Sequence, residues 1–105
     1  MATPLSLHTG RRDDGTVLLS AIGELDLSNI DAFTAAFAAI VGNGTPDQQV
    51  TVDFTQVEYL DSGAINALFE HADRIRRIIV NPILMSVLTV SGLTSVATVE
   101  AAQQD

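Results

Sequence analysis

The segment Tyr59-Leu-Asp-Ser-Gly-Ala-Ile-Asn-Ala67 decides the fold, because it joins a predicted strand to a predicted helix. Before it, Val50-Thr-Val-Asp-Phe54 alternates apolar and polar residues and is rich in β-branched types, the pattern of a half-buried strand. After it, apolar residues recur at helical spacing and define one face: Ile65, Leu68, Phe69, Ala72, Ile75 and Ile79. A strand is therefore expected to turn directly into a helix at Asp61-Ser62-Gly63.

Asp61 and Ser62 are residue types that begin helices. Their side-chain oxygens accept hydrogen bonds from the first free backbone N–H groups of a helix. Those N–H groups, together with the positive end of the helix dipole, also favour a phosphate. Local chemistry therefore leaves two interpretations of Ser62: a plain helix N-cap, or a serine whose modification is read by a partner.

The first part of the chain predicts a β-hairpin. Residues 5–9 have the pattern of a first strand, and residues 11–15 contain the Asp-Gly pair typical of a hairpin turn. Residues 16–23 are then the antiparallel partner strand.

A helix is predicted to follow this hairpin. Asp26 or Ser28 is expected to cap it, and glycine at Gly42-Asn-Gly44 is expected to end it in a left-handed turn. Its apolar face comprises Ile30, Phe33, Phe37 and Ile40. Residues 45–49 are a predicted loop, and the next strand begins near residue 49. The resulting β-α-β unit predicts an α/β fold in which helices pack against a mixed sheet of four to five strands.

The carboxyl-terminal third allows two interpretations. In the first, the second helix continues to about Ile79, Asn81-Pro82 stops it, and residues 83–90 form a strand. In the second, residues 78–80 form the strand and residues 83–90 a helix. The long run of helical spacing favours the first. Ser91 is expected to cap a last short helix, and residues 101–105 are expected to form a frayed tail.

The two turns and their order resemble a known family. Gly23-Glu-Leu-Asp26, the strand Val50-Thr-Val-Asp-Phe54 and Tyr59-Leu-Asp-Ser-Gly63 resemble the STAS domain of bacterial anti-sigma factor antagonists, over about residues 17–79. In that family an Asp-Ser-Ser-Gly turn starts a helix, and its first serine is phosphorylated by the anti-sigma factor, which is also a kinase. The resemblance places Ser62 on the phosphoacceptor, Asp61 on the preceding aspartate and Asp26 on the acidic residue of the neighbouring loop.

The chain departs from the family turn at two positions. The second serine of the turn is Gly63 here, and the following glycine is Ala64, so a Cβ stands where the family has none. These changes affect the shape of the turn and its recognition by a kinase, whereas the phosphoacceptor itself is retained.

Length and composition predict one domain that spans residues 1–105. A chain of 105 residues can bury one core. Polar residues interrupt every apolar run well short of the roughly 20 residues that a membrane span needs. The amino terminus lacks the charged and apolar regions of a signal peptide, which predicts a cytoplasmic protein without membrane insertion. Cysteine is absent, which excludes disulfides and thiol chemistry.

The charge argues against nucleic acid as a partner. Five arginines, no lysine and thirteen acidic residues give a formal net charge of −8, which repels phosphate backbones. The basic residues Arg74, Arg76 and Arg77 are expected near the end of the second helix, where cations complement the dipole. They have two interpretations: a solvated helix end, or a contact for an acidic partner.

Catalysis is not predicted. The two histidines, His8 and His71, lie in no metal-ligand spacing, and no nucleophile elbow or glycine-rich phosphate loop is present. Asp26, Asp53 and Asp61 could converge on Mg²⁺, but each is also explained as a cap, a turn or a solvated strand residue. No metal or other cofactor is expected.

The resemblance implies a binding module that changes partners. The unphosphorylated protein would dock its serine turn and second helix onto an anti-sigma factor with serine kinase activity, phosphorylation of Ser62 would end the docking, and a phosphatase would reset it. The expected contacts are the turn residues Asp26, Asp61, Ser62 and Gly63 and three polar positions placed on the second helix, Asn66, Glu70 and Asp73.

Two other interpretations stay open. STAS domains also serve as constitutive structural subunits of transporter or signalling assemblies, in which the turn serine need not be phosphorylated, and Gly63 and Ala64 suit that role. A small-molecule sensor has no sequence signature behind it.

Overall fold

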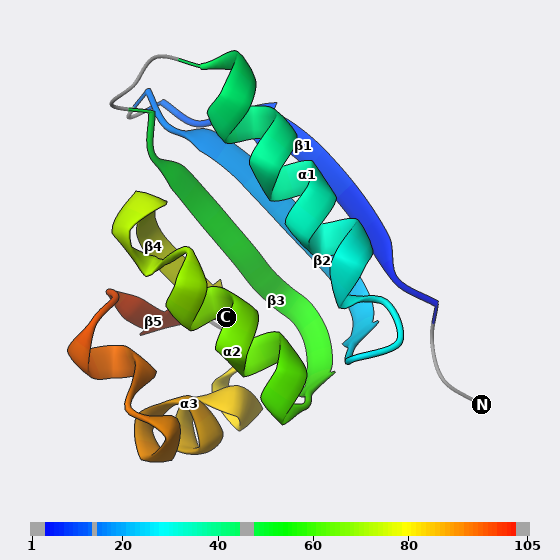
Figure 1. Ribbon diagram of the computed structural model, residues 1–105. Helices are drawn as coiled ribbons and strands as arrows, with labels where there is room; N and C mark the ends of the chain where they lie inside the picture. Colours follow the sequence, from blue (N-terminus) through cyan, green and yellow to red (C-terminus); the bar gives the residue numbers. More distant parts are fainter. Residues whose placement is uncertain (1–3, 14, 45–47, 103–105) are drawn as a thin grey trace.

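The computed structural model describes residues 4–13, 15–44 and 48–102. One five-stranded mixed sheet has the order β1-β2-β3-β4-β5 (Figure 1). β1 pairs with β2 in antiparallel fashion, and β2 to β5 pair in parallel. The strands are β1 Ser6–Arg11, β2 Val17–Leu25, β3 Val50–Leu60, β4 Ile75–Val80 and β5 Val99–Ala101. The predicted α/β fold with a mixed sheet is thus confirmed.

The helices cover one face of this sheet. α1 and α2 lie side by side across it in Figure 1, and α3 lies beyond them near β5. The helices are α1 Ile30–Asn43, α2 Ser62–Glu70 and α3 Met85–Ser91, and single 3₁₀ turns are η1 Ala72–Arg74, η2 Pro82–Leu84 and η3 Leu93–Ser95. Each of the three parallel connections, β2-α1-β3, β3-α2-β4 and β4-α3-β5, therefore contains a helix, as parallel β-α-β units require.

The core forms between the sheet and the helices. Alternate residues of β2 and β3 face the helices and are fully buried, including Leu19, Val52 and Phe54. Phe33 of α1 packs its ring against Phe54, with 5.6 Å between ring centroids, and against Phe37 of the next turn at 6.2 Å. The apolar face predicted for the first helix is therefore the face that packs on the sheet.

The predicted hairpin is also present. The backbone N–H of Gly15 donates to the carbonyl of Arg12 over 3.0 Å, and Gly15 has a φ of 88°. Glycine adopts this left-handed conformation without a steric penalty. The turn thereby sets the antiparallel register in which Arg11 lies opposite Val17.

The long second helix was the wrong choice of the two interpretations. α2 ends at Glu70, and β4 begins at Ile75, where the sequence also spaces apolar residues three and four apart. Ile78 and Val80 are fully buried in the sheet, and Ile78 lies opposite Val52 of β3. Pairing with β3 stabilises a strand of β-branched residues here, so these tertiary contacts decide the secondary structure against the helical spacing of the sequence.

The same correction applies to residues 83–90, which form no strand. Asn81 accepts a hydrogen bond from the backbone N–H of Ile83, Pro82 opens η2, and α3 follows. The alternative interpretation, a strand through residues 78–80 and a helix through 83–90, is the one that the structure supports. The tail expected from residue 101 is wrong for Ala101, which pairs with Val80 in β5, and residues 103–105 lie outside the described part of the chain.

Three predicted helix boundaries also differ. Asn29, not Asp26 or Ser28, precedes α1, and its side chain bonds to the loop instead of to the helix. α1 ends at Asn43 as expected, but Gly44 is extended with a φ of −97°, so the left-handed turn predicted there is absent; residues 45–47 of the predicted loop lie outside the described residues. Ser91 ends α3, and a left-handed Gly92 leads into the single turn η3.

Candidate functional site

Ser62 lies where two parallel strands end together. Leu25 of β2 is opposite Leu60 of β3, so the loops that leave these strands meet at the carboxyl-terminal edge of the sheet. Ser62 is the first residue of α2 and is exposed. Within the described part of the chain, its hydroxyl has no hydrogen-bond partner. The site therefore presents an accessible nucleophilic oxygen at a helix N-terminus.

Asp61, and not Ser62, is the N-cap of α2. Its Oδ1 accepts the backbone N–H of Ala64 over 2.9 Å, and its Oδ2 accepts that of Leu27 over 2.8 Å. The Ala64 N–H, and then the Leu27 N–H, lower the pKa of Asp61 below its ordinary value of 3.8, while partial desolvation acts in the opposite direction. The cap is therefore an ionised carboxylate at neutral pH, and the serine is left free of that structural task.

Asp26 shapes the neighbouring loop. Its Oδ1 accepts hydrogen bonds from both the backbone N–H and the hydroxyl of Ser28, so the carboxylate is turned toward its own loop. Asn29 donates from Nδ2 to the carbonyl of Glu24 and accepts from the backbone N–H of Asp26, which closes the same turn. The two predicted acidic residues, Asp26 and Asp61, thus lie in adjacent loops, each held by local hydrogen bonds.

Leu27 is a site residue that sequence reasoning missed. Its side chain is 74% exposed and lies against Gly63: a Cβ built on Gly63 would be 3.0 Å from the Leu27 Cδ1 and 3.3 Å from the Asp61 Oδ1. Gly63 thus makes room for the leucine. Tyr59, 48% exposed at the end of β3, is a second missed apolar residue at this edge. The signal in the sequence was an apolar leucine inside a turn of otherwise polar residues.

Ala64 fits its position without strain. It is fully buried on the inner side of the first turn of α2. A methyl group at this point packs in the core and favours the helix over glycine by about 1 kcal/mol. The departure from the family turn at this residue therefore alters the core side of the helix and leaves the exposed side unchanged.

The three predicted contacts on the second helix do not all lie there. Asn66 and Glu70 are exposed residues of α2, four and eight positions after Ser62. Asp73 is exposed too, but it belongs to η1, because α2 ends at Glu70. The neighbouring Arg74 donates from Nε and Nη2 to the carbonyl of Gln48, just before β3 begins. Asp73 therefore lies toward the opposite end of the sheet from Ser62.

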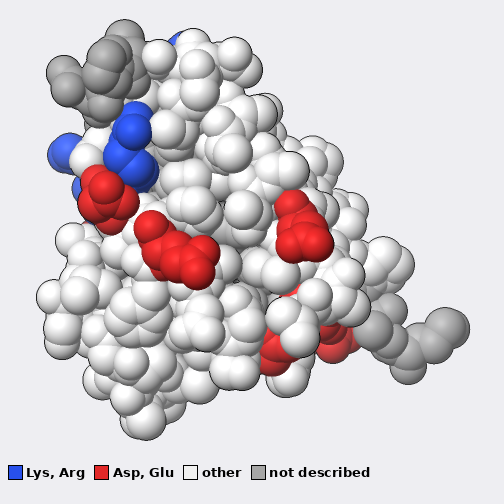
Figure 2. Space-filling view, in the orientation of Figure 1, with Lys and Arg blue, Asp and Glu red and all other residues white. Residues whose placement is uncertain are grey.

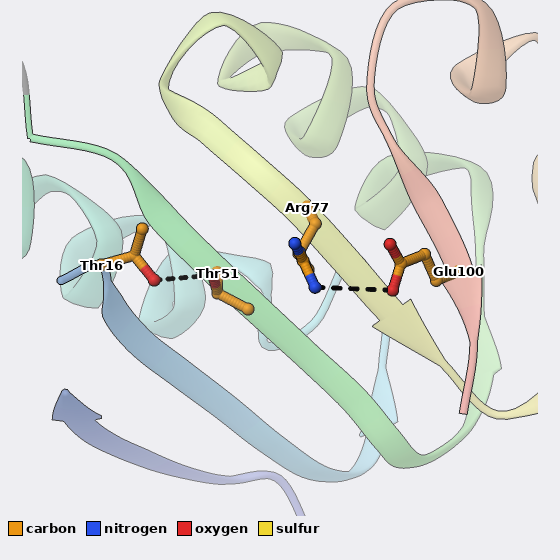
Figure 3. Close-up of polar contacts among 4 residues, drawn as sticks. All are labelled: Thr16, Thr51, Arg77 and Glu100. Carbon is orange, nitrogen blue, oxygen red and sulfur yellow. Dashed lines mark hydrogen bonds and ion pairs between the residues drawn. The ribbon is translucent and has the colours of Figure 1, made fainter. Parts of the chain in front are cut away.

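The basic residues are also displaced from the predicted helix end. Arg74 is in η1, and Arg76 and Arg77 are in the first half of β4. Arg11 ends β1 opposite the first residue of β2, so it lies at that same amino-terminal edge of the parallel strands, with Arg12 next to it. Figure 2 shows arginine side chains gathered at the upper left, with acidic side chains beside and below them and others at the lower right. Arg77 forms an ion pair with Glu100 of β5 over 3.8 Å (Figure 3). All five arginines of the chain thus gather at the end of the sheet remote from Ser62.

The three aspartates considered for Mg²⁺ do not converge. Asp53 lies in the middle of β3, and its Oδ1 accepts the backbone N–H of Thr55 at an irregularity of the strand. Asp26 and Asp61 lie at the carboxyl-terminal edge. Among the residues that the structure describes, no group of three or more histidine, aspartate or glutamate side chains is placed to hold a metal ion.

The sequence matches the family description "Mlab, STAS domain" over residues 8–100. The chain belongs to the STAS domain family. That match extends the resemblance seen around the two turns to β1 at one end and β5 at the other. No curated protein matches the sequence closely enough to be informative.

Solved structures share this STAS fold at low sequence identity. An anti-sigma factor antagonist from Mycobacterium paratuberculosis aligns with a TM-score of 0.80 at 19% identity, over 92% of this chain and 86% of that one. The anti-sigma factor antagonist SpoIIAA in its unphosphorylated form aligns at 0.71 and 18%, over 94% and 90%. An uncharacterised protein from Shewanella loihica PV-4 with a SpoIIAA-like fold aligns at 0.63 and 13%, over 100% and 90%.

The helices of this STAS domain are all short. In the described residues, none combines the length and the hydropathy needed to cross a membrane.

Proposed function

We propose that this STAS domain is an anti-sigma factor antagonist that docks the Ser62 turn and α2 onto an anti-sigma factor with serine kinase activity. Phosphorylation of Ser62 ends the docking, a phosphatase restores it, and the cycle takes place in the cytoplasm. The proposal rests on the arrangement at the start of α2, where the side chain of Asp61 caps the helix and the side chain of Ser62 is exposed beside it.

The surroundings of Ser62 suit a dry contact with a protein. Leu27 and Tyr59 are large apolar side chains exposed near the same edge of the sheet. Isolated exposed apolar residues are ordinary, but Leu27 lies against Gly63, the residue that follows Ser62. A partner that covers Leu27 must also cover the Ser62 turn, because Leu27 packs on Gly63.

A phosphate at this position changes docking without refolding the domain. It adds about −1.5 to −2 charges at neutral pH, and the free N–H groups at the start of α2 tolerate an anion. A partner surface that is complementary to a neutral hydroxyl and a leucine offers no group to pair with the phosphate. Binding to this surface would therefore remove water from an unpaired charge. An unpaired buried charge costs several kcal/mol, which lowers affinity by roughly a hundredfold or more.

Two variants of Ser62 test the proposal directly. The domain is incubated with candidate kinase-type anti-sigma factors and Mg·ATP, its intact mass is measured, and binding is followed by titration calorimetry. Ser62→Ala is expected to remain unmodified and bound, whereas Ser62→Asp binds at least tenfold more weakly. Ser86→Ala, at an exposed serine of α3, is the matched control and should be phosphorylated and released like the unaltered protein. Equal affinity of the two Ser62 variants would overturn the proposal.

A second candidate is a constitutive structural subunit of a transporter or signalling assembly. The matched family description names a STAS domain without an anti-sigma role, and Gly63 departs from the phosphorylated turn. In that case the protein co-purifies with a transport ATPase or a multi-subunit particle. Intact mass of the protein from its own cells, with and without stress, separates the two candidates: a Ser62 phosphate of changing occupancy favours the antagonist, and a persistently unmodified Ser62 favours the subunit.

A further inference from the structure

Three arginines line one pocket at the amino-terminal edge of the parallel strands. The pocket has a volume of about 480 Å³, and its described lining residues are Arg11, Arg12, Asp13 and Arg77. Cations are scarce in this chain, which has five arginines, no lysine and thirteen acidic residues. More than half of its arginines therefore share a single pocket, at the end of the sheet remote from Ser62. The proposed docking leaves this pocket unused.

Arg77 reaches the pocket from the face of the sheet that the helices leave open. It lies opposite Thr51 of β3, and the next pair along, Ile78 and Val52, is fully buried against the helices. Because successive side chains of a strand point to opposite faces, Arg77 and Thr51 lie on the open face. Figure 3 shows both side chains with Glu100 of β5, and the helices lie behind the sheet in this view.

A pair of threonines connects the hairpin to the strand beside Arg77. The hydroxyls of Thr16 and Thr51 are 2.9 Å apart, and both residues are buried (Figure 3). The backbone N–H of Arg12 donates to the carbonyl of Thr16 over 2.9 Å. The backbone that carries Arg12 is thereby fixed relative to β3 and β4, so the pocket is part of the folded domain.

Within the described residues, the guanidinium group of Arg77 makes no hydrogen bond. Its Nη1 lies 3.8 Å from the Glu100 Oε2, which is too long for a hydrogen bond. Its Nε is buried and has no hydrogen-bond partner in the same part of the chain. Buried polar atoms of native proteins are nearly always paired, so this donor points to an acceptor that the described residues do not supply.

The charge balance of the pocket favours an anion with about two charges. Three guanidinium groups and the one carboxylate of Asp13 leave a formal excess of two positive charges among the described lining residues. A phosphate monoester carries about −1.5 to −2 charges at neutral pH. Guanidinium groups also match the oxygens of a phosphate in geometry, because they donate pairs of parallel N–H···O hydrogen bonds.

We propose that this pocket, defined by Arg11, Arg12 and Arg77, binds the phosphate group of a small soluble molecule. Its volume is that of a small-molecule site. The net charge of −8 repels extended anionic surfaces such as nucleic acid or an acidic membrane. A compact phosphate interacts mainly with the arginines beside it, because salt screens charges beyond about 8 Å.

Titration calorimetry of the full chain with inorganic pyrophosphate, without divalent cations, tests the pocket. Arg12→Gln and Arg77→Gln should each weaken binding about tenfold or more. Arg77→Lys keeps the charge but loses the paired donors, so it should weaken binding severalfold. Arg76→Gln is the matched control, because it removes the same charge from an exposed residue of β4 outside the pocket. It should change the affinity by no more than about twofold.

Two further variants locate the bound anion. Glu100→Gln removes the carboxylate that competes for Arg77, so it should strengthen binding severalfold. Ser62→Ala, at the helix N-terminus at the other end of the sheet, should bind pyrophosphate as the unaltered protein does. Circular dichroism verifies that each variant is folded. Pyrophosphate should raise the melting temperature of the unaltered protein but not that of Arg77→Gln.

Absence of both binding heat and thermal stabilisation at up to about 10 mM pyrophosphate would overturn the proposal. Equal losses in Arg76→Gln and Arg77→Gln would contradict it too, because they indicate attraction by diffuse charge. Loss of binding in Ser62→Ala would place the anion at α2 instead. Binding to vesicles that contain phosphatidic acid, without binding to pyrophosphate, would assign the arginines to a membrane surface and exclude a soluble ligand. None of these readouts depends on an anti-sigma factor or on phosphorylation of Ser62.

Discussion

Asp61 ties Leu27 to the start of α2: one carboxylate oxygen accepts the N–H of Leu27 over 2.8 Å, and the other accepts the N–H of Ala64 over 2.9 Å. One side chain thereby fixes two loops that are 34 residues apart in sequence. Asp61 directly precedes Ser62, so these two hydrogen bonds also fix the start of the helix on which Ser62 lies. Because both hydrogen bonds of Asp61 lie within the domain, their contribution can be measured from the free energy of unfolding in the absence of a partner.

Removal of this carboxylate should destabilise the domain. Asp61→Ala removes the cap and leaves the N–H groups of Leu27 and Ala64 without that acceptor, so we expect a loss of about 1–2 kcal/mol in the free energy of unfolding. Urea denaturation followed by circular dichroism measures it. Glu70→Ala, at an exposed acidic residue of the same helix, is the control and should change stability by no more than about 0.5 kcal/mol. A similar loss of unfolding free energy in both variants would show that the Asp61 cap contributes no more to stability than an exposed acidic residue of the same helix.

The stabilisation by Asp61 should disappear in acid. The pKa of Asp61 is lower in the folded protein than its ordinary value of 3.8, chiefly because of the N–H of Ala64 and then that of Leu27. The ionised group therefore contributes stability that is fully present above the unfolded pKa and is lost as the pH falls through the folded pKa. The difference in unfolding free energy between the unaltered protein and Asp61→Asn should shrink from pH 6 toward pH 3. A difference that is constant over this range would contradict the assignment.

Leu27 and Gly63 should be energetically coupled. Gly63→Ala improves helix propensity by up to about 1 kcal/mol, but its Cβ would lie 3.0 Å from the Leu27 Cδ1. We expect the substitution to stabilise a Leu27→Ala background more than it stabilises the native sequence, by about 0.5 kcal/mol or more. A double-mutant cycle from thermal unfolding gives this coupling energy. If the two changes in unfolding free energy are strictly additive, the Leu27 side chain adopts another rotamer without loss of stability when Gly63 is replaced by alanine.

His71 should be replaceable by an apolar ring. Its side chain stacks on Phe37 with 4.6 Å between ring centroids, and its buried Nε2 has no hydrogen-bond partner among the described residues. Because an unsatisfied buried polar atom costs about 1–3 kcal/mol, we expect His71→Phe to leave stability unchanged or to raise it by about 1 kcal/mol. The cap of α2 survives, since it is the backbone N–H of His71 that donates to the carbonyl of Ala67. His8→Phe, on the exposed edge strand, is the control. A clear loss for His71→Phe alone would indicate a polar partner of Nε2.

The order of strands and helices up to Ser62 is predicted correctly from the sequence, although the start and the C-cap of α1 are not, because local signals and tertiary packing agree there. Each pattern in this part of the chain fits only one type of secondary structure. The examples are the Asp-Gly turn, the apolar face of α1 and the alternating strand before Asp61. Between Ile75 and Val90 the patterns are ambiguous, since isoleucines three and four apart suit a helix as well as the pairing of β4 with β3. Pairing between distant strands decided that region, and the local spacing contains no trace of it.

The sequence indicates the hydrogen-bonding residue types at the start of α2, but not which of them makes which hydrogen bond. Asp61 and Ser62 were both possible caps, and only the hydrogen bonds of Asp61 to Ala64 and Leu27 show which of them caps the helix. Leu27 escaped notice because its importance depends on a contact with Gly63, across two loops. Asp73 was placed on the wrong element because the end of α2 was misjudged. Residues that act through distant contacts were thus the ones that the sequence concealed.

The gathering of all five arginines at one end of the sheet gives the domain an electrical polarity. Glu24, Asp26, Glu58 and Asp61 lie near the other end, around Ser62, so the molecule has a negative pole at its candidate docking surface. The electrostatic field of a basic partner would orient the domain before contact, so that the surface around Ser62 faces the partner. Encounters would be oriented as well as attracted, and this guidance fades as ionic strength rises.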